Sequence, residues 1–176
     1  PPTRIKDYLK QKEEKLKQQE QKFDNFLPQL NLIQKAVEKK TDAEIYRGWK
    51  GMQTVYSDLL DSLKSGEEYF IFGASKGEDE KRVKSFYTRF SEKASQKKLK
   101  AKIIFNVKAR GNIPKVDKKA EVRYLSHTTP SETLIFKNKT AIVLLEKEPL
   151  VILIRGDSIS KSFKEYFKIM WGVANQ

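Results

Sequence analysis

The chain contains no cysteine and only one histidine among its 176 residues. Without thiols it can form no disulfide, no thiol nucleophile and no thiolate metal site. The histidine, His127, lies in the segment SHTTPSE, and a lone histidine cannot build a zinc site of the usual kind. As a general base it would need a partner such as Glu132, five residues further on. We therefore expect an exposed loop histidine, no metal site and no cofactor.

Long apolar runs are also missing. No stretch approaches the roughly 18 apolar residues that indicate a membrane-spanning helix, so we expect no membrane partner. The N-terminus is charged from Arg4 onward and has no apolar signal-peptide core, which together with the absence of disulfides predicts a cytoplasmic location. The abrupt start at Pro1-Pro2 predicts that this chain is cut from a longer protein.

Acidic residues are scarce in the middle of the chain. The formal net charge is +13, and residues 76–119 hold 15 basic and 5 acidic side chains, so this segment alone contributes +10. Its densest part is residues 93–102. A basic surface of this size can lie along nucleic acid. The alternative is a solvated, lysine-rich helix face, which the lack of interleaved aromatic residues favours.

The first 40 residues carry a heptad pattern, the spacing that keeps one apolar seam on a supercoiling helix. Too few apolar residues are present for such a helix to be stable alone, so it needs a partner helix. We favour a second copy of the chain over the same chain folded back. Pro28 predicts a kink or restart near Leu27. The dimerisation residues predicted by this pattern are Ile5, Leu9, Leu16, Phe23 and Leu30.

The pattern changes after Thr41, and residues 41–176 are predicted to form one α/β domain. Strand patterns alternate with helix patterns, which indicates a layered sheet that is largely parallel in its first half, and the closing hairpins indicate a mixed sheet overall. Helices are expected over residues 48–63 and 78–98 and from Ser158 onward, with Glu78-Asp79-Glu80 capping the second of them. The expected strands are residues 43–47, 68–74, 102–106, 120–125, 132–136, 140–145 and 150–155.

Strand ends followed by helices are where open α/β sheets bind ligands. The loop FGASKGED, residues 72–79, occupies such a position, but it lacks both the P-loop ending and the dinucleotide-binding spacing. Its backbone amides could bind a hydroxyl or a carboxylate, or the loop is a plain turn. The three strands and the helix that end the chain offer neither a nucleophile nor metal ligands at the positions where these are expected.

Several segments together resemble the C-terminal effector-binding half of archaeal TrmB-type transcriptional regulators, which has a phospholipase-D-like fold. The resemblance covers about residues 43–174, and the preceding helix matches the coiled-coil linker that follows the winged helix-turn-helix of such regulators. The segments are YRGWKGM at 46–52, EYFIFGAS at 68–75, KIIFN at 102–106 followed by Ala109-Arg110-Gly111, VRYL with TPSE, and the pattern FxxYFxxMW at 163–171.

The resemblance also implies what is missing. Catalytic members of the phospholipase-D-like superfamily carry His-x-Lys-x4-Asp on the strand that reads SETLIFKNK here. With Glu132 at the histidine position, Leu134 takes the lysine position and Asn138 or Lys139 falls near the aspartate. Leucine cannot stabilise a phosphoryl oxyanion, so we expect no phosphodiester cleavage and a cleft that is open to a small molecule.

The resemblance therefore predicts a non-catalytic, ligand-sensing and dimerising fragment of a transcription regulator, with DNA bound by a winged helix-turn-helix domain absent from this chain. Sugars are the effectors that the family implies. Three alternatives remain: a nucleic-acid-binding module that uses the lysine-rich face of residues 93–119, a diverged phosphodiesterase, and a purely structural dimer. The candidate ligand contacts at the strand ends are Arg47, Ser75, Asn106, Arg110, Ser131 and Glu132.

Overall fold

The computed structural model describes residues 2–37, 41–74, 76–111, 113, 116–117, 119–126 and 129–175. The chain divides into two compact units, Pro1–Lys40 and Thr41–Gln176. In the described ranges, no helix combines the length and the apolar character needed to cross a membrane.

The first unit is a single helix, α1, over Pro2–Val37. It continues through Pro28, so of the kink or restart predicted near Leu27, the restart does not occur. Proline removes one backbone N–H, and the flanking turns of a helix this long remain intact. The side chain of Leu30 lies outside the described part. The other predicted seam residues are each more than half exposed in the single chain: Ile5, Leu9, Leu16 and Phe23.

The second unit contains a seven-stranded sheet, whose order is β1-β7-β6-β5-β2-β3-β4. The three strands from β2 to β4 are parallel, whereas β5, β6, β7 and β1 continue the sheet in antiparallel pairs. The predicted mixed α/β sheet is thus confirmed. The strands are β1 Asp42–Arg47, β2 Glu68–Ala74, β3 Lys100–Asn106, β4 Glu121–Leu125, β5 Ser131–Phe136, β6 Lys139–Leu144 and β7 Leu150–Arg155.

The prediction of a largely parallel first half is confirmed for β2, β3 and β4. The first strand, β1, does not join a parallel first half but lies at the opposite edge of the sheet, antiparallel to β7. Both sides of β2 are already occupied, by β3 and by β5, so β1 has no place beside it. Ile45 at this edge is 61% exposed.

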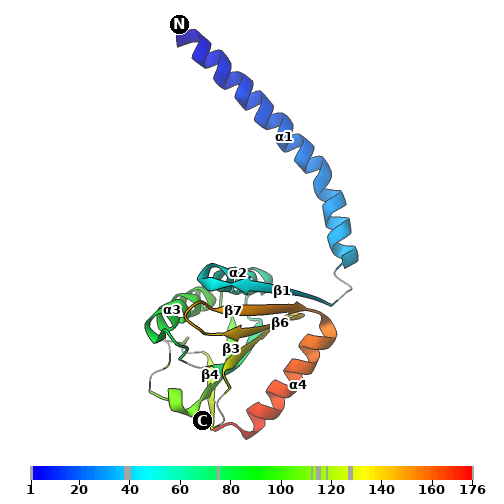
Figure 1. Cartoon of the computed structure of the whole chain (residues 1–176). Helices are drawn as coiled ribbons and strands as arrows, with labels where there is room; N and C mark the ends of the chain where they lie inside the picture. The colour runs from blue at the N-terminus through cyan, green and yellow to red at the C-terminus, as the bar shows by residue number, and fades with distance from the viewer. Residues whose placement is uncertain are drawn as a thin grey trace. The chain divides into compact units, whose positions relative to one another are not determined.

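Helices cover both faces of the sheet (Figure 1). Helices α2 (Gly48–Ser62) and α3 (Glu80–Gln96) pack on one face, and α4 (Asp157–Val173) packs on the other. The amide of Arg82 donates to Asp79 Oδ1 over 3.0 Å, so the acidic run before α3 caps the helix as predicted. A short 3-10 helix, η1 (Val107–Ala109), follows β3.

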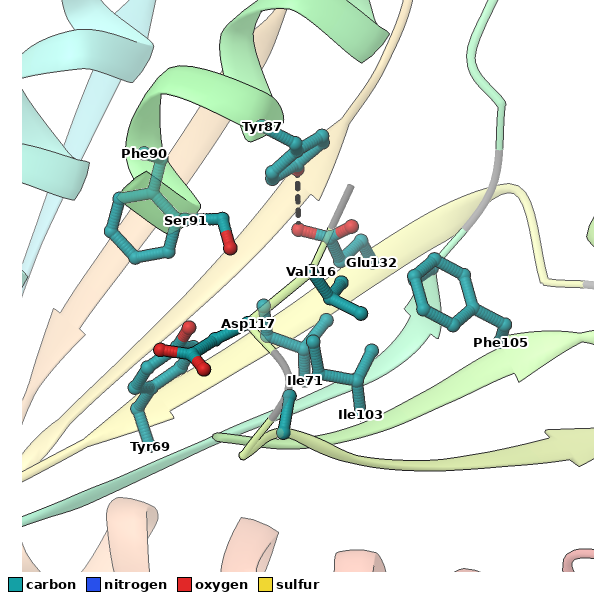
Figure 2. A pocket seen from close by; sticks show the side chains of 12 residues that line it. Tyr69, Ile71, Tyr87, Phe90, Ser91, Ile103, Phe105, Val116, Asp117 and Glu132 are labelled. Carbon is teal, nitrogen blue, oxygen red and sulfur yellow. Dashed lines mark hydrogen bonds between the residues drawn. The ribbon is translucent and has the colours of Figure 1, made fainter. Parts of the chain in front are cut away.

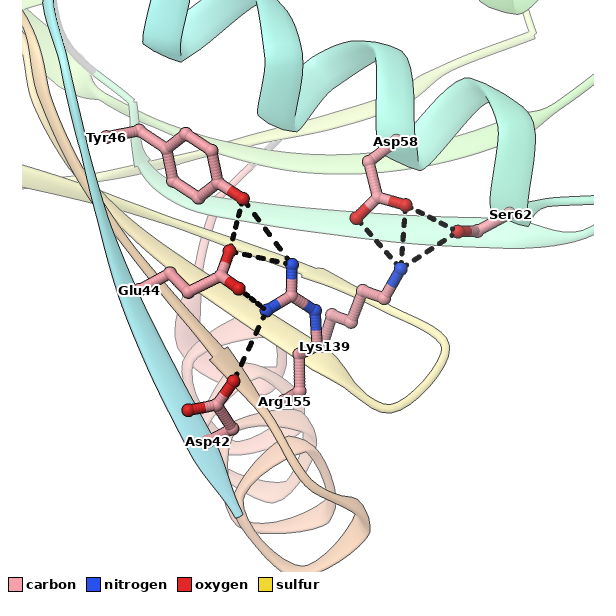
Figure 3. A network of polar contacts seen from close by, with 7 residues as sticks. All are labelled: Asp42, Glu44, Tyr46, Asp58, Ser62, Lys139 and Arg155. Carbon is pink, nitrogen blue, oxygen red and sulfur yellow. Dashed lines mark hydrogen bonds and ion pairs between the residues drawn. The ribbon is translucent and has the colours of Figure 1, made fainter. Parts of the chain in front are cut away.

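Polar contacts attach β1 and α2 to the antiparallel half of the sheet (Figure 3). Arg155 on β7 lies 2.9 Å from Glu44 and 3.7 Å from Asp42, both on β1. The Arg155 hydrogen bond holds the pKa of Glu44 below its usual value. Lys139 on β6 donates to both carboxylate oxygens of Asp58 on α2, over 2.7 and 2.8 Å. Lys139, at the position near the catalytic aspartate of the resemblance, therefore has a structural partner.

Thr140 on β6 is fully buried, and its Oγ1 has no hydrogen-bond partner in the part of the chain that the structure describes. An unsatisfied buried hydroxyl costs free energy, and valine has the same shape without that group. We expect Thr140→Val to raise the free energy of unfolding by about 1 kcal/mol, as measured by urea denaturation. Ser160→Ala is the contrasting control, because the Ser160 hydroxyl donates to the Lys137 carbonyl over 2.8 Å. Ser160→Ala should lower the free energy of unfolding by a similar amount. A lower free energy of unfolding in both variants would contradict the prediction.

Candidate ligand site at the ends of the parallel strands

The candidate site lies where β2 and β3 end and β5 begins. Strand β5 runs antiparallel to β2, with Thr133 opposite Phe72, so the first residues of β5 lie beside the carboxyl end of β2. This is the edge at which open α/β sheets bind ligands. Ser131 and Glu132 start β5, and Asn106 ends the neighbouring parallel strand β3.

Gly73 allows the end of β2 to approach the start of β5 closely. Its φ is +75°, and a Cβ at this position would lie 2.5 Å from both the Ser131 carbonyl oxygen and Thr129 Oγ1. No other residue fits this conformation and this space. The glycine therefore helps to fix the position of Ser131 and of the glutamate that follows it.

Glu132 is the central polar residue of the site, and it is only 2% exposed. The hydroxyls of Tyr56 on α2 and Tyr87 on α3 each donate to Glu132 Oε1 over 2.6 Å, and the second of these bonds is drawn in Figure 2. The two hydroxyl oxygens are 2.9 Å apart. The other carboxylate oxygen, Oε2, accepts no hydrogen bond from the described residues. A buried carboxyl group thus retains an unused acceptor.

The electrostatics of this cluster follow from its burial. Removal from water raises the pKa of Glu132 above its usual value, although the two tyrosine hydrogen bonds act in the opposite direction. Burial also raises the pKa of Tyr56 and of Tyr87, and the neighbouring carboxyl group adds to this effect. Both tyrosines therefore remain protonated hydrogen-bond donors at physiological pH.

A cavity of about 30 Å³ adjoins Glu132, as Figure 2 shows. This volume can hold one or two water molecules. Its lining is mostly aromatic and aliphatic, with the two carboxyl groups of Glu132 and Asp117 and no cationic side chain among the described residues. The lining residues are Tyr69, Ile71, Ala74, Tyr87, Phe90, Ser91, Ile103, Phe105, Val116, Asp117, Ala120 and Glu132.

An open pocket of about 480 Å³ lies at the same edge of the sheet. It contains Asn106, whose side chain accepts a hydrogen bond from the Lys108 amide over 2.8 Å and so caps η1. Thr129 and Pro130, which lead into β5, also line it, as do the last residue of β6 and the two residues that follow it. Both charge signs are present here, including Lys76 and Glu146, so this pocket is far less selective by charge than the buried cavity.

Three of the six predicted ligand contacts, Ser131, Glu132 and Asn106, lie at this edge of the sheet, where Glu132 lines the buried cavity and Asn106 lines the open pocket. Arg47 ends β1 at the same edge of the sheet. However, β1 lies three strand spacings from β5, a distance of about 14 Å. The guanidinium of Arg110 lies 4.9 Å from the centre of the Tyr124 ring. Ser75 and His127 lie outside the described residues.

The sequence analysis missed Tyr56 and Tyr87 as partners of Glu132. The available signal was Glu132 itself, because a carboxyl group within an apolar strand requires donors from the elements that cover it. In the described part of the chain, no three acidic or histidine side chains gather in a way that could hold a metal ion.

Comparisons with known proteins identify the fold. No protein-family model matches the sequence, and neither does any curated protein. Among solved structures, the chain is similar to TrmBL2, an archaeal chromatin protein whose structure shows a novel mode of DNA binding. The two are 18% identical with a TM-score of 0.55, over 97% of this chain and 67% of that one.

The chain is also similar to two further solved structures. NucT from Helicobacter pylori is 10% identical with a TM-score of 0.55, over 77% of this chain and 99% of that one. Nuc from Salmonella typhimurium, a phospholipase D family member, is 12% identical with a TM-score of 0.50, over 77% and 97%. These likenesses show that this chain has a phospholipase-D-like fold.

Proposed function

We propose that this chain is the non-catalytic, ligand-sensing and dimerising part of a DNA-binding transcription regulator. The observation that carries the proposal is Glu132, a buried carboxyl group beside a cavity at the edge of the sheet where α/β sheets bind ligands, with one oxygen that accepts no hydrogen bond from the described residues. The likeness to TrmBL2 over 97% of this chain supports the association with DNA. A winged helix-turn-helix domain upstream would make the DNA contacts.

Hydrolysis of a phosphodiester does not fit this site. The phosphoryl oxygens need positive charge or aligned donors as the transition state forms. The cavity instead offers the carboxyl groups of Glu132 and Asp117, and Leu134, at the lysine position of the resemblance, is fully buried. Two acidic groups repel a phosphate, so the site disfavours both the substrate and the transition state.

The same chemistry selects the ligand class. Glu132 Oε2 and the Asp117 carboxylate accept hydrogen bonds, so the ligand must supply donors, either hydroxyl groups or a protonated amine. Tyr69, Phe90 and Phe105 provide apolar ring surface for the rest of the molecule. Sugars, which the TrmB resemblance implies, are one such class. Anionic ligands such as sugar phosphates are excluded by the charge of the site.

The small size of the cavity connects binding to a change of conformation. A ligand larger than two water molecules must widen the space between α3 and the sheet, so the protein with ligand differs from the protein without it. If the two conformations favour different arrangements of the paired α1 helices, ligand binding shifts the spacing of the upstream DNA-binding domains. A useful shift requires a differential affinity of a few kcal/mol.

The test is a thermal-shift comparison of matched neutral and phosphorylated ligands, for example glucose with glucose 6-phosphate and maltose with maltose 1-phosphate, together with small amines. We expect at least one neutral or cationic ligand to stabilise the chain, by about 2.7 kcal/mol at a hundred times its Kd. Glu132→Gln should remove the shift, because its amide presents donors to the ligand in place of an acceptor oxygen. Equal stabilisation by the phosphorylated partner, or a shift that survives in Glu132→Gln, would refute the proposed site. Turnover of a generic phosphodiester that is lost in Glu132→Ala would instead show an enzyme.

A further inference from the structure

A second hollow lies between α2 and α3, and we call it the α2–α3 groove. Its volume is about 660 Å³. Four cationic side chains and one acidic side chain, Glu92, line it together with polar and aromatic residues. The cationic residues are Lys50 on α2 and Arg82, Arg89 and Lys93 on α3.

The charges of the groove are exposed and uncompensated. Lys50, Arg82, Arg89 and Lys93 are all exposed, and none of them forms an ion pair with another described residue. They give the groove a local net charge of +3 with Glu92 included (four basic minus one acidic). A surface of this kind attracts anions and raises their local concentration.

Two lysines of the lysine-rich segment at residues 93–119 have partners elsewhere in the α/β unit. Lys97 donates to the Leu60 carbonyl, and Lys102 pairs with Glu121 at 3.7 Å. Lys93 is the one described lysine of residues 93–102 that lines the groove. The fold therefore places a concentrated cationic site on α2 and α3, to which this segment contributes Lys93.

Aromatic rings form part of the groove lining. Trp49 on α2 and Phe86 on α3 are half-buried, with ring centres 6.0 Å apart. The Arg82 guanidinium lies 4.6 Å from the Trp49 ring centre, and the indole N–H donates to the Lys147 carbonyl over 3.1 Å, which holds the ring in place. Aromatic rings and guanidinium planes are the surfaces on which unpaired bases stack. The sequence gives no sign of this arrangement, because the rings and cations come from two separate helices.

We propose that the α2–α3 groove binds single-stranded nucleic acid. The phosphates lie along the cations of α3, where Arg82, Arg89 and Lys93 occupy positions i, i+7 and i+11 over about 16 Å of helix. Bases stack on the Trp49, Phe86 and Arg82 surface. A duplex reaches only the exposed cations at the rim, since its bases are paired and turned away from a recessed aromatic surface. Tyr56 and Phe90 line this groove and also belong to the Glu132 site, but the inference does not rest on a ligand at Glu132.

The test is fluorescence anisotropy with a labelled 15-nucleotide pyrimidine strand and the intact chain, between 50 and 200 mM salt. We expect Arg89→Gln/Lys93→Gln to weaken binding at least tenfold and to reduce the log–log salt slope by about 1.4, the value for two lost phosphate contacts on a single strand. Phe86→Leu should weaken binding about tenfold without changing that slope, because it removes stacking and no charge. Thermal melting of each variant establishes that it is folded.

Lys10→Gln/Lys161→Gln is the matched control, since it removes two exposed positive charges outside the groove. It should weaken binding no more than twofold. The proposal is overturned if this control loses as much affinity as the groove variant, or if a duplex of equal length binds as tightly and with the same dependence on Phe86. Displacement of the strand by an equimolar acidic peptide would assign the groove to a protein partner, which also overturns it.

Discussion

Replacing both Tyr56 and Tyr87 by phenylalanine is expected to lower the free energy of unfolding by about 3 kcal/mol at pH 7. Each hydroxyl donates to the same oxygen of a carboxyl group that is 2% exposed. A hydrogen bond to a charged group contributes about 1.5–3 kcal/mol, and two bonds to one acceptor contribute less than their sum. Phenylalanine preserves the ring packing on α2 and α3, so the effect isolates the hydroxyls. Urea denaturation measures it.

The loss should depend on pH in a definite direction. The folded pKa of Glu132 is above its usual value of 4.5, so its charge weakens the folded state increasingly as the pH rises from 4.5 through the folded pKa. Removing both donors raises that folded pKa further. The double variant and the unmodified chain therefore differ least near pH 4, where Glu132 is protonated in both, and most at neutral pH. Glu44, Glu67 and Asp117 have lowered pKa values, but they are present in both chains and cancel in the comparison.

The matched control repeats the same double substitution in a Glu132→Leu background. Without the carboxyl group, the tyrosine hydroxyls have lost their acceptor and retain only each other, 2.9 Å apart. Their removal should then cost less than about 1 kcal/mol and show no dependence on pH between 4 and 7. A cost of 3 kcal/mol that persists in this background would mean that the tyrosines do not act through Glu132.

Local sequence patterns predict most of the fold. Strands β2 and β7 have the bounds that were expected, because an apolar run between turn residues leaves little choice of where a buried strand starts and stops. The inward positions of α2 and α3 follow from helical spacing in the same way. The pairing of β1 could not be predicted from its own residues. It depends on β3 and β5, later in the chain, which occupy both sides of β2.

The candidate site was predictable only in part. Glu132 stands out in the sequence because a carboxyl group lies at the start of a largely apolar strand. Its two partners lie 76 and 45 residues away on different helices, and only the packing of α2 beside α3 over the start of β5 brings their hydroxyls to one oxygen. The α2–α3 groove was missed for the same reason, since its cations and rings belong to two segments. Contacts that depend on tertiary packing have no local signal.

The second large effect concerns the dimer that α1 is proposed to form. Leu9→Glu/Leu16→Glu is expected to raise the dimer dissociation constant at least a hundredfold, as measured by sedimentation equilibrium. Both side chains are more than half exposed in the single chain, and they are seven residues apart in the predicted seam. Two charges facing two charges across a buried seam add repulsion to the lost apolar contact, and 2.7 kcal/mol corresponds to about a hundredfold change in affinity.

Gln18→Glu/Gln21→Glu provides the control, because it adds the same two charges to exposed positions of α1 outside the seam. This variant should dimerise within threefold of the unmodified chain. The helical circular dichroism of α1 is a second measure of dimer dissociation. A helix with this few apolar residues is only marginally stable in water by itself, so a dissociated α1 loses helical circular dichroism while the α/β unit keeps its own. A chain that is monomeric at 100 µM with α1 fully helical contradicts the paired-helix proposal, because its exposed seam then needs no partner.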